Sequence, residues 1–263
     1  MEELKILFED REILVAVKPE GVDSEAAGGF GRDMVNMIRN HLAQNGGAQN
    51  SGAQNSGGGR NSGSGQNSGG AKNSRPGSAQ PPYVGVIRRL DKPVSGIMVF
   101  AKTKEAAAAL SKELREGKMT KTYRAILCGQ PAEKSGTLTD WMIQEKKGNL
   151  SRVGKKTDPG AKEAKLTYTV LRKQFLEGQQ VSEVEIRLLT GRHHQIRVQF
   201  ASRGMPLMGD RKYNPAYQVS PPAGLCGTSG MGRHLCLTAV SLSFTHPKTR
   251  KPMHFSIDPP FSL

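Results

Sequence analysis

The sequence has little that suits a membrane or an oxidising compartment. No stretch of its 263 residues approaches the roughly 18 consecutive apolar residues that a membrane-spanning helix needs. No basic segment followed by an apolar one opens the chain, as a secretion signal would. Only three cysteines occur, and their spacing provides neither a disulfide framework nor a zinc site: Cys128, Cys226 and Cys236. We therefore expect a cytoplasmic protein with reduced thiols and no membrane contact.

Motifs for nucleotides, covalent serine chemistry and metals are also missing. There is no Walker-type loop and no serine within a Gly-x-Ser-x-Gly elbow. The glycine-rich stretch at residues 28–31 does not lie between a strand and a helix, as a dinucleotide-binding loop would. His193 and His194 are adjacent, so they would point apart on a helix, and no third ligand is suitably spaced. The sequence indicates no metal, no nucleotide and no other cofactor.

The charge is strongly positive. Lys and Arg number 38 against 23 Asp and Glu, which leaves a formal net charge of +15 at pH 7. A surplus of this size favours a polyanion as the partner, although it does not say which polyanion or whether chemistry is done on it.

One segment is set apart by its composition. From about residue 44 to residue 80 the chain is nearly all Asn, Gly, Ser, Gln and Ala, with Asn-Ser recurring every six residues. Such a segment buries too little apolar surface to offset the entropy of ordering it. We interpret it as a disordered insertion in a surface loop. A weak RNA-sweeping tail is the alternative, since its charged residues, Arg60, Lys72 and Arg75, are all positive.

Outside that insertion, strands outnumber helices. Apolar patterning predicts strands at 6–8, 13–17, 84–89, 97–101, 121–127, 166–171, 181–189, 240–244 and 253–257. Helices are expected after Asp33, which can cap one with Met34, Ile38 and Leu42 on one face, from Thr103 to Arg115, and from His193 to Arg203 before Gly204. The elements follow no steady βαβ rhythm. The predicted fold is therefore α+β, with a mixed, mainly antiparallel sheet and flanking helices.

The densest polar cluster, RRLDKPVSG at residues 88–96, follows one predicted strand and precedes another. Asp91 would lie on a loop between rigid neighbours, where catalytic residues tend to occur. The surrounding cations would keep it ionised, and an ionised carboxylate can act as nucleophile or base. The alternative is an aspartate that caps the turn before Lys92 and Pro93, with Arg88 and Arg89 as ordinary surface charge.

Two further segments could serve a site. In the segment 189–197, Gly191 permits a turn into a helix on which His193 and Arg197 would share one face, while Ile196 and Phe200 face the core. Arginine and histidine near a helix N-terminus suit an anion. The basic strand around 121–124 carries Tyr123, which could stack on a base or be an ordinary half-buried strand residue.

Taken in order, these segments resemble the RluA-type members of the RluA/RsuA pseudouridine synthase group. The matching segments cover nearly the whole chain outside the insertion: ILVAVKPEG at 13–21, RLDKPVSG at 89–96, KTY at 121–123, TGRHHQIR at 190–197, Gly209-Asp210 with Tyr213, and LSFTHP at 242–247.

This resemblance implies an isomerase that converts uridine in RNA to pseudouridine without a cofactor. It implies a mixed, mainly antiparallel sheet with a central catalytic cleft. We expect one catalytic domain over residues 1–263, interrupted by the insertion, with no preceding S4 domain. The expected partner is structured RNA, ribosomal or transfer RNA, and the expected state is a monomer.

The resemblance also implies roles for residues of the site. Asp91 matches the catalytic aspartate, Tyr123 the tyrosine that stacks on the target base, and Arg197 the arginine that pairs with the aspartate. Arg89 matches the arginine implicated in RNA contact and base displacement. The residues expected to contact RNA are Arg88, Arg89, Arg192 and His193.

The chain departs from the usual residues of the family at four positions. The family usually has His where this chain has Arg88, and Thr where it has Val94. It usually has His at the positions of Gln199 and Thr238. These changes affect substrate recognition and local hydrogen bonding more than the class of reaction. The alternative function is a catalytically weak RNA-binding or RNA-folding factor on the same fold. Retention of Asp91, Tyr123 and Arg197 argues against it.

Overall fold

The structure is a computed structural model that describes residues 4–25, 32–46, 81–145, 147–176, 178–214 and 234–263. The Asn/Gly/Ser-rich insertion therefore lies outside the described residues, except for positions 44–46, which end a helix. Cys226 and the glycine-rich stretch at 28–31 also lie outside them.

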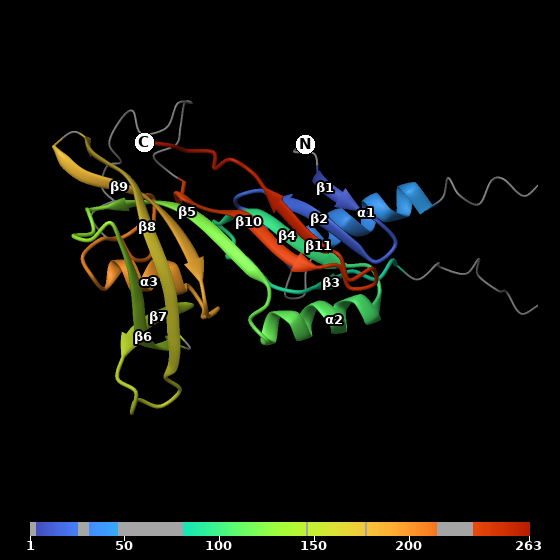
Figure 1. Ribbon diagram of the computed structural model, residues 1–263, viewed down its shortest axis with the longest axis horizontal. Helices are drawn as coiled ribbons and strands as arrows, with labels where there is room; N and C mark the ends of the chain where they lie inside the picture. The colour runs from blue at the N-terminus through green and yellow to red at the C-terminus, as the bar shows by residue number, and fades with distance from the viewer. Residues whose placement is uncertain (1–3, 26–31, 47–80, 146, 177, 215–233) are drawn as a thin grey trace, which may run out of the picture.

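One sheet of eleven strands runs through the described residues (Figure 1). The strands are β1 (Lys5–Glu9), β2 (Ile13–Lys18), β3 (Gly85–Val86), β4 (Ser95–Ala101), β5 (Thr120–Cys128), β6 (Ser135–Glu145), β7 (Leu150–Gly154), β8 (Lys162–Leu176), β9 (Gln179–Leu188), β10 (Leu237–Thr245) and β11 (Pro252–Ser256). Their order is β1-β2-β4-β10-β5-β9-β8-β6-β7, with β11 beside β10 and β3 beside β4. Only the β4–β10 pair is parallel among these pairings, so the predicted mixed, mainly antiparallel sheet is confirmed.

The parallel β4–β10 pair depends on one glycine. Gly96 has φ +127°, and a Cβ at this position would collide with the backbone of Ala239, its partner on β10. Only glycine fits this close approach, and β4 begins one residue earlier, immediately after the loop that carries Asp91.

Three helices are described: α1 (Met34–Gly46), α2 (Lys104–Arg115) and α3 (Gln195–Ala201). The two predicted caps are confirmed. Asp33 Oδ1 accepts a hydrogen bond from the Asn36 N–H at 2.9 Å, and Thr103 Oγ1 accepts one from the Ala106 N–H at 3.1 Å. Such side chains satisfy backbone donors that a helix N-terminus leaves without partners.

The first two helices cover opposite faces of the β2–β4 pair. Alternate residues of a strand point to opposite faces. One set, including Ile13 and Ile97, packs against Leu110 of α2, and the other, including Leu14, packs against Ile38 of α1. Both faces of this pair are therefore buried, which explains why β2 and β4 read as continuous apolar runs.

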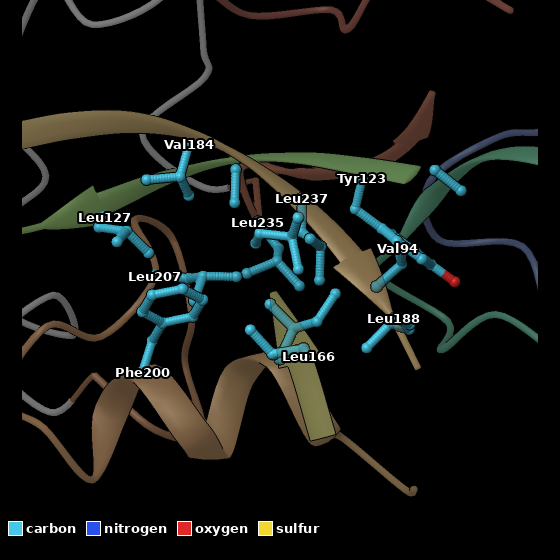
Figure 2. Packing of buried hydrophobic residues seen from close by; sticks show 14 of the residues in the cluster. Val94, Tyr123, Leu127, Leu166, Val184, Leu188, Phe200, Leu207, Leu235 and Leu237 are labelled. Carbon is cyan, nitrogen blue, oxygen red and sulfur yellow. The ribbon is translucent and has the colours of Figure 1, made fainter. Parts of the chain in front are cut away.

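Helix α3 packs on the other half of the sheet. Ile196 and Phe200 enter a cluster with Leu166 of β8 and Val184 of β9, as the predicted core face of this helix requires (Figure 2). Truncation of a fully buried phenylalanine such as Phe200 typically costs about 3–5 kcal/mol. This packing holds the polar face of the α3 segment toward the site.

Some elements differ from the prediction. Strands β6 and β7 were not predicted, because β6 buries fully only Leu138 and Met142 and so shows little alternation. The strand predicted over 84–89 is confined to Gly85–Val86. The helix predicted from His193 begins at Gln195, so His193 and Arg197 do not share a helical face. The chain turns at His194, whose φ of 54° and ψ of 26° are left-handed.

No helix among the described residues has both the length and the apolar character needed to cross a membrane. The same described residues contain no group of three or more His, Cys, Asp or Glu side chains suited to a metal ion.

Candidate active site

A cleft of about 520 Å³ opens between the Asp91 loop and the α3 half of the molecule. Its walls come from the loop after β3, from β5, from the turn between β9 and α3, and from β6 and β7. All the residues predicted for the site line it: Arg88, Arg89, Asp91, Tyr123, Arg192, His193 and Arg197. The structure therefore brings together segments that lie more than 100 residues apart in sequence.

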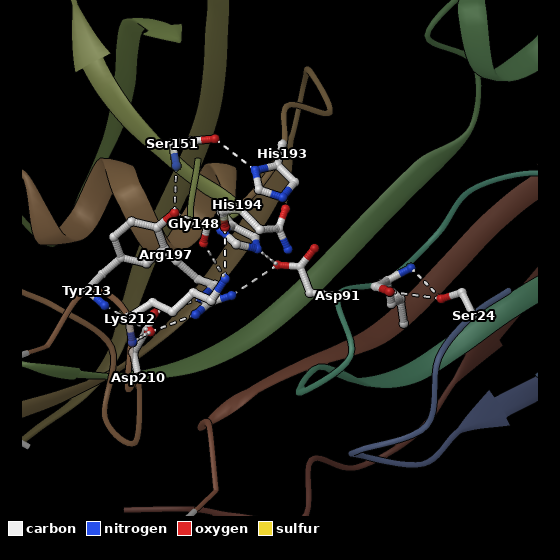
Figure 3. A network of polar contacts seen from close by, with 12 residues as sticks. Ser24, Asp91, Gly148, Ser151, His193, His194, Arg197, Asp210, Lys212 and Tyr213 are labelled. Carbon is white, nitrogen blue, oxygen red and sulfur yellow. Dashed lines mark hydrogen bonds and ion pairs between the residues drawn. The ribbon is translucent and has the colours of Figure 1, made fainter. Parts of the chain in front are cut away.

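The loop that carries Asp91 is held on both sides of this residue. The Ser24 hydroxyl donates to the Leu90 carbonyl at 2.8 Å and accepts from the Leu90 N–H at 3.0 Å (Figure 3). On the other side, the Lys92 carbonyl accepts from the Gly21 N–H at 2.9 Å and from Lys18 Nζ at 3.0 Å. The backbone around Asp91 therefore has little freedom to move.

Lys18 makes this clamp from inside the core. Its side chain is fully buried, and Nζ also donates to the carbonyls of Pro19 and Val22 at 2.9 and 2.6 Å. Burial lowers the pKa of Lys18 to about 8, while nearby Asp23 and Asp91 act to raise it. The group is thus mainly an ammonium at pH 7, and its three N–H bonds each find a carbonyl. Lys18 was not among the predicted site residues, although it lies in one of the matching segments.

Arg197 is bound first to Asp210 and only second to Asp91. Its Nε and Nη2 donate to the two oxygens of Asp210, each at 2.7 Å, whereas Nη1 reaches Asp91 Oδ2 at 3.4 Å. Burial acts to lower the pKa of Arg197, but the hydrogen bond and charge of Asp210 outweigh it and raise this pKa. The expected Arg197–Asp91 contact therefore exists, but the bidentate partner is Asp210, which lies in one of the matching segments and was given no role there.

His194 is the second group that approaches Asp91. Its Nε2 lies 3.6 Å from Asp91 Oδ2, and its Nδ1 lies 2.7 Å from the Tyr213 hydroxyl (Figure 3). Burial, followed by the charge of Arg197, lowers the pKa of His194 to about 2. The imidazole is therefore neutral at pH 7, and its contact with Asp91 is not an ion pair.

His193, which the sequence favoured over its neighbour, has a different partner. Its Nδ1 lies 2.8 Å from the Ser151 hydroxyl on β7, and its ring stacks on that of His194 with centroids 3.7 Å apart. Burial lowers the pKa of His193 as well. The two stacked rings have different partners, Ser151 and Tyr213. The backbone at His194 is left-handed, and a pattern of adjacent histidines gives no sign of such a turn.

Tyr123 lies in the wall of the cleft with only 4% of its surface exposed. Burial raises the pKa of its hydroxyl, although a hydrogen bond from Arg88 acts the other way. Arg88 in turn lies over Gly191, where a Cβ would fall 2.8 Å from the guanidinium carbon. Gly191 therefore leaves room for Arg88 to reach Tyr123.

The other two predicted RNA contacts lie further out. Arg89 is exposed at the cleft, and the Arg192 Nε donates to the carbonyl of Glu163 on β8 at 2.7 Å. Together with Arg88 and Arg197 they make the cleft strongly cationic.

Gln199, which replaces the usual histidine of the family, has hydrogen-bond partners for its whole amide group. Its Nε2 donates to Asp140 Oδ2 at 2.7 Å and to the Ala164 carbonyl at 3.2 Å, and its Oε1 accepts from Gln195 at 3.1 Å. Of the other unusual residues, Val94 is buried in the core and the Thr238 hydroxyl pairs with Ser95 at 2.9 Å. The polar groups of Gln199 and Thr238 thus have partners within the protein.

Comparison with known proteins agrees with this arrangement. The family model described as RNA pseudouridylate synthase matches residues 12–202. An uncharacterized RNA pseudouridine synthase of Aquifex aeolicus is 30% identical over 258 residues, which cover 98% of this chain and 70% of that protein. The ribosomal large subunit pseudouridine synthase D of Zymomonas mobilis is 30% identical over 259 residues, covering 98% of this chain and 69% of the relative. The dual-specificity RNA pseudouridine synthase RluA of Yersinia pestis is 31% identical over 180 residues, 66% of this chain and 78% of the relative.

Among solved structures, human RNA pseudouridylate synthase domain containing 1 superposes with a TM-score of 0.67. The alignment covers 99% of this chain and 85% of the human one at 21% identity, and so supports the fold. The family match spans most of the chain, and the cleft gathers the residues that its motifs contain. This chain belongs to the RNA pseudouridylate synthase family, and it is an RNA pseudouridine synthase, an isomerase that acts on RNA.

Proposed function

We propose that Asp91 is the catalytic carboxylate for the isomerisation of uridine to pseudouridine. One observation carries this assignment: Asp91 is the only Asp or Glu among the described residues that line the cleft. Its side chain is 28% exposed, so a ligand in the cleft can touch it. The clamp from Ser24 and Lys18 supports the assignment, because a catalytic group needs a defined position.

The reaction needs a carboxylate at this place. The C1′–N1 bond of the uridine breaks, the uracil rotates, and C5 bonds to C1′, after which C5 loses its proton and N1 gains one. An ionised Asp91 serves either by adding to C1′ or by removing a proton from the sugar. Arg197 orients it in both routes.

The remaining residues of the cleft bind the substrate. Tyr123 offers its ring to the target base, and its protonated hydroxyl provides a donor beside it. A base in structured RNA must leave its stack, which costs a few kcal/mol, about 2–4. Arg89 displaces it and contacts the phosphate backbone, together with Arg88, Arg192 and His193.

The substrate we propose is a specific uridine in ribosomal or transfer RNA. The names of two relatives support this choice, since one acts on the ribosomal large subunit and another has dual specificity. The continuous sheet supports a single catalytic domain that carries the insertion as a loop. We also propose that the protein acts as a monomer in the cytoplasm.

Mapping of pseudouridines in total RNA tests the proposal. Cells with and without the gene are compared by carbodiimide labelling and reverse-transcription stops. We expect stops to disappear at one or a few uridines and to return with the wild-type protein but not with Asp91→Asn. Return of the stops with Asp91→Asn would contradict the role of Asp91. An unchanged map in ribosomal and transfer RNA would favour the RNA-binding factor instead.

A further inference from the structure

We propose that His194 is a positioning residue that directs the Asp91 carboxylate toward the substrate. In this arrangement a neutral imidazole points its Nε2–H at Asp91 Oδ2, and the Tyr213 hydroxyl selects that tautomer. The proposal rests on the proposed catalytic role of Asp91. It starts from two contacts of one imidazole, Nδ1 to the Tyr213 hydroxyl at 2.7 Å and Nε2 to Asp91 Oδ2 at 3.6 Å.

The hydrogen bonds of Tyr213 determine which nitrogen carries the proton. Its hydroxyl oxygen accepts from the backbone N–H of Ser151 on β7 at 2.9 Å. The hydroxyl hydrogen is then available for Nδ1 of His194, and in the proposed arrangement Nδ1 accepts it. A neutral imidazole that accepts at Nδ1 carries its hydrogen at Nε2, on the side of Asp91. The opposite tautomer would turn a nitrogen lone pair toward the carboxylate, which is repulsive.

The charges around His194 keep it to a single proton. Arg197, His193 and Lys212 disfavour the imidazolium, and burial does so most strongly. The His194 side chain is only 5% exposed. His194 therefore offers Asp91 an N–H that orients the carboxylate. Because the imidazole is neutral, it carries no additional acidic proton that it could give to Asp91.

The two donors to Asp91 share one oxygen. Both His194 Nε2 and Arg197 Nη1 approach Oδ2, at 3.6 and 3.4 Å. Among the described residues no hydrogen bond or ion pair involves the side-chain oxygen Oδ1 of Asp91. The hydrogen bond from Arg197 and the approach of His194, both on Oδ2, favour one orientation of the carboxylate and leave Oδ1 free for the sugar. His194 contributes an N–H here that Arg197, bound bidentately to Asp210, cannot replace.

The backbone supports a dedicated role for this residue. His194 adopts a left-handed conformation that a non-glycine residue rarely takes, and it does so immediately before α3. Strain of this kind persists where the surroundings impose it, and it clusters at functional sites. Figure 3 shows the result, with the His194 ring between Tyr213 and Asp91.

Four variants test the proposal, with kcat and KM measured on an RNA that the mapping identifies. Removal of a positioned donor in an active site typically costs about 100-fold in kcat, and we expect that loss for His194→Ala with KM changed less than about threefold. His194→Gln retains an N–H donor and should recover to within about tenfold of wild type. Tyr213→Phe removes the hydroxyl that selects the tautomer of His194, and it should lower kcat about tenfold. Combined with His194→Gln, Tyr213→Phe should have no further effect on kcat.

The chain offers a matched control in His246. This residue is also buried, its Nε2 lies 2.8 Å from Asp10 Oδ2, and its Nδ1 accepts from the backbone N–H of Thr249 at 3.0 Å. His246→Gln should lower the melting temperature while kcat stays within about twofold of wild type. A similar fall of kcat in both His→Gln variants would show that the effect at His194 is one of stability.

NMR of the protein labelled with nitrogen-15 at histidine gives a readout independent of turnover. We expect the His194 ring to show the Nε2–H tautomer, unchanged from pH 5 to pH 8, and to show mixed tautomers in Tyr213→Phe. A titrating ring, or an Nδ1–H tautomer, would overturn the proposal. So would equal kcat values for His194→Ala and wild type in a protein that Asp91→Asn inactivates. Activity retained by Asp91→Asn would instead contradict the proposed role of Asp91.

Discussion

Two buried histidines each face a carboxylate in this protein, and the two pairs differ in how tightly the carboxylate is held. Asp10 Oδ1 accepts from the backbone N–H groups of Glu12 and Ile13, both at 2.8 Å, and its Oδ2 lies 2.8 Å from His246 Nε2. Among the described residues, the Asp91 carboxylate in the cleft has only the 3.6 Å and 3.4 Å contacts with His194 and Arg197, both on Oδ2.

The difference separates a structural carboxylate from one available to a ligand. At Asp10 both oxygens have short bonds that join the β1–β2 turn to the turn after β10, and a new partner would have to displace one of them. At Asp91 the backbone is clamped and the side chain is not, so the position of the loop is defined while one oxygen stays open. Buried hydrogen bonds contribute stability where they are short and complete, and an incomplete set leaves capacity for a substrate.

The largest contrast is expected from the same substitution at both aspartates. Asp91→Asn should lower kcat by about 1,000-fold or more, because the amide can neither add to C1′ nor remove a proton. Its affinity for RNA and its melting temperature should stay close to wild type. Asp10→Asn should retain kcat and lose about 1–2 kcal/mol of unfolding free energy, because it weakens three hydrogen bonds. Single-turnover kinetics and urea unfolding distinguish them, and reversed results would break the comparison.

Asp210→Asn should affect both activity and stability. It removes the charge that pairs with the buried Arg197, and an uncompensated buried charge typically costs about 3–5 kcal/mol. Because Arg197 would then move, kcat should fall about 100-fold. Glu145→Gln is the control, since Glu145 and its partner Arg152 are 42% and 53% exposed and such a pair contributes roughly 1 kcal/mol or less. Equal loss of stability in the two variants would show that burial of the Arg197–Asp210 pair does not matter.

Gly191→Ala should have a smaller effect that is confined to the cleft. The new methyl group would displace the guanidinium of Arg88, which is the flexible end of a side chain, and would weaken its bond to Tyr123. We expect a fall in kcat/KM of less than about tenfold, with an unchanged melting temperature. The same substitution in an Arg88→Ala background should add nothing, and an added loss there would mean that the backbone at Gly191 moves.

His194 and Asp10 should affect the pH dependence of stability in two separate pH ranges. His194 has its pKa lowered to about 2, so the unfolded chain takes up a proton below about pH 6.5 and the native chain does not. Stability is therefore lost as the pH falls from about 6.5, and His194→Gln should flatten the melting temperature between pH 6.5 and 4.5. The groups that face this imidazole are Asp91, Arg197, His193, Lys212 and Tyr213.

Asp10 affects stability in the lower of the two pH ranges. Burial acts to raise its pKa, but hydrogen bonds from Ile13, Glu12 and His246 outweigh it and lower this pKa. Its stabilising effect is therefore present above the usual carboxyl pKa, near 3.8, and is lost as the pH falls through the lower native value. Asp10→Asn should lower the melting temperature by a nearly constant amount above about pH 4.5, and this difference from wild type should shrink below that pH. A difference that shrinks between pH 6.5 and pH 5 would contradict the separation.

Much of the fold was predictable because it depends on local patterns. The continuous apolar runs of β2 and β4 identified strands, and Asp33 and Thr103 identified helix starts, since a cap acts within three residues of itself. The predicted site residues were also brought together as expected. Strands β6 and β7 escaped prediction because the pairing of β6 with β8 and of β7 with β6, and not their own apolar pattern, makes them strands.

The amino-acid sequence alone was sufficient to establish the class of the molecule: its cationic character, its mixed sheet, its motifs in order and the aspartate, tyrosine and arginine they contain. It could not tell that Asp210 holds Arg197 more tightly than Asp91 does, or that His194 faces Asp91 and His193 does not. Those choices depend on a left-handed turn and on contacts between segments remote in sequence. The energy of such contacts exists only once α3, β7 and the Asp91 loop have packed around one cleft.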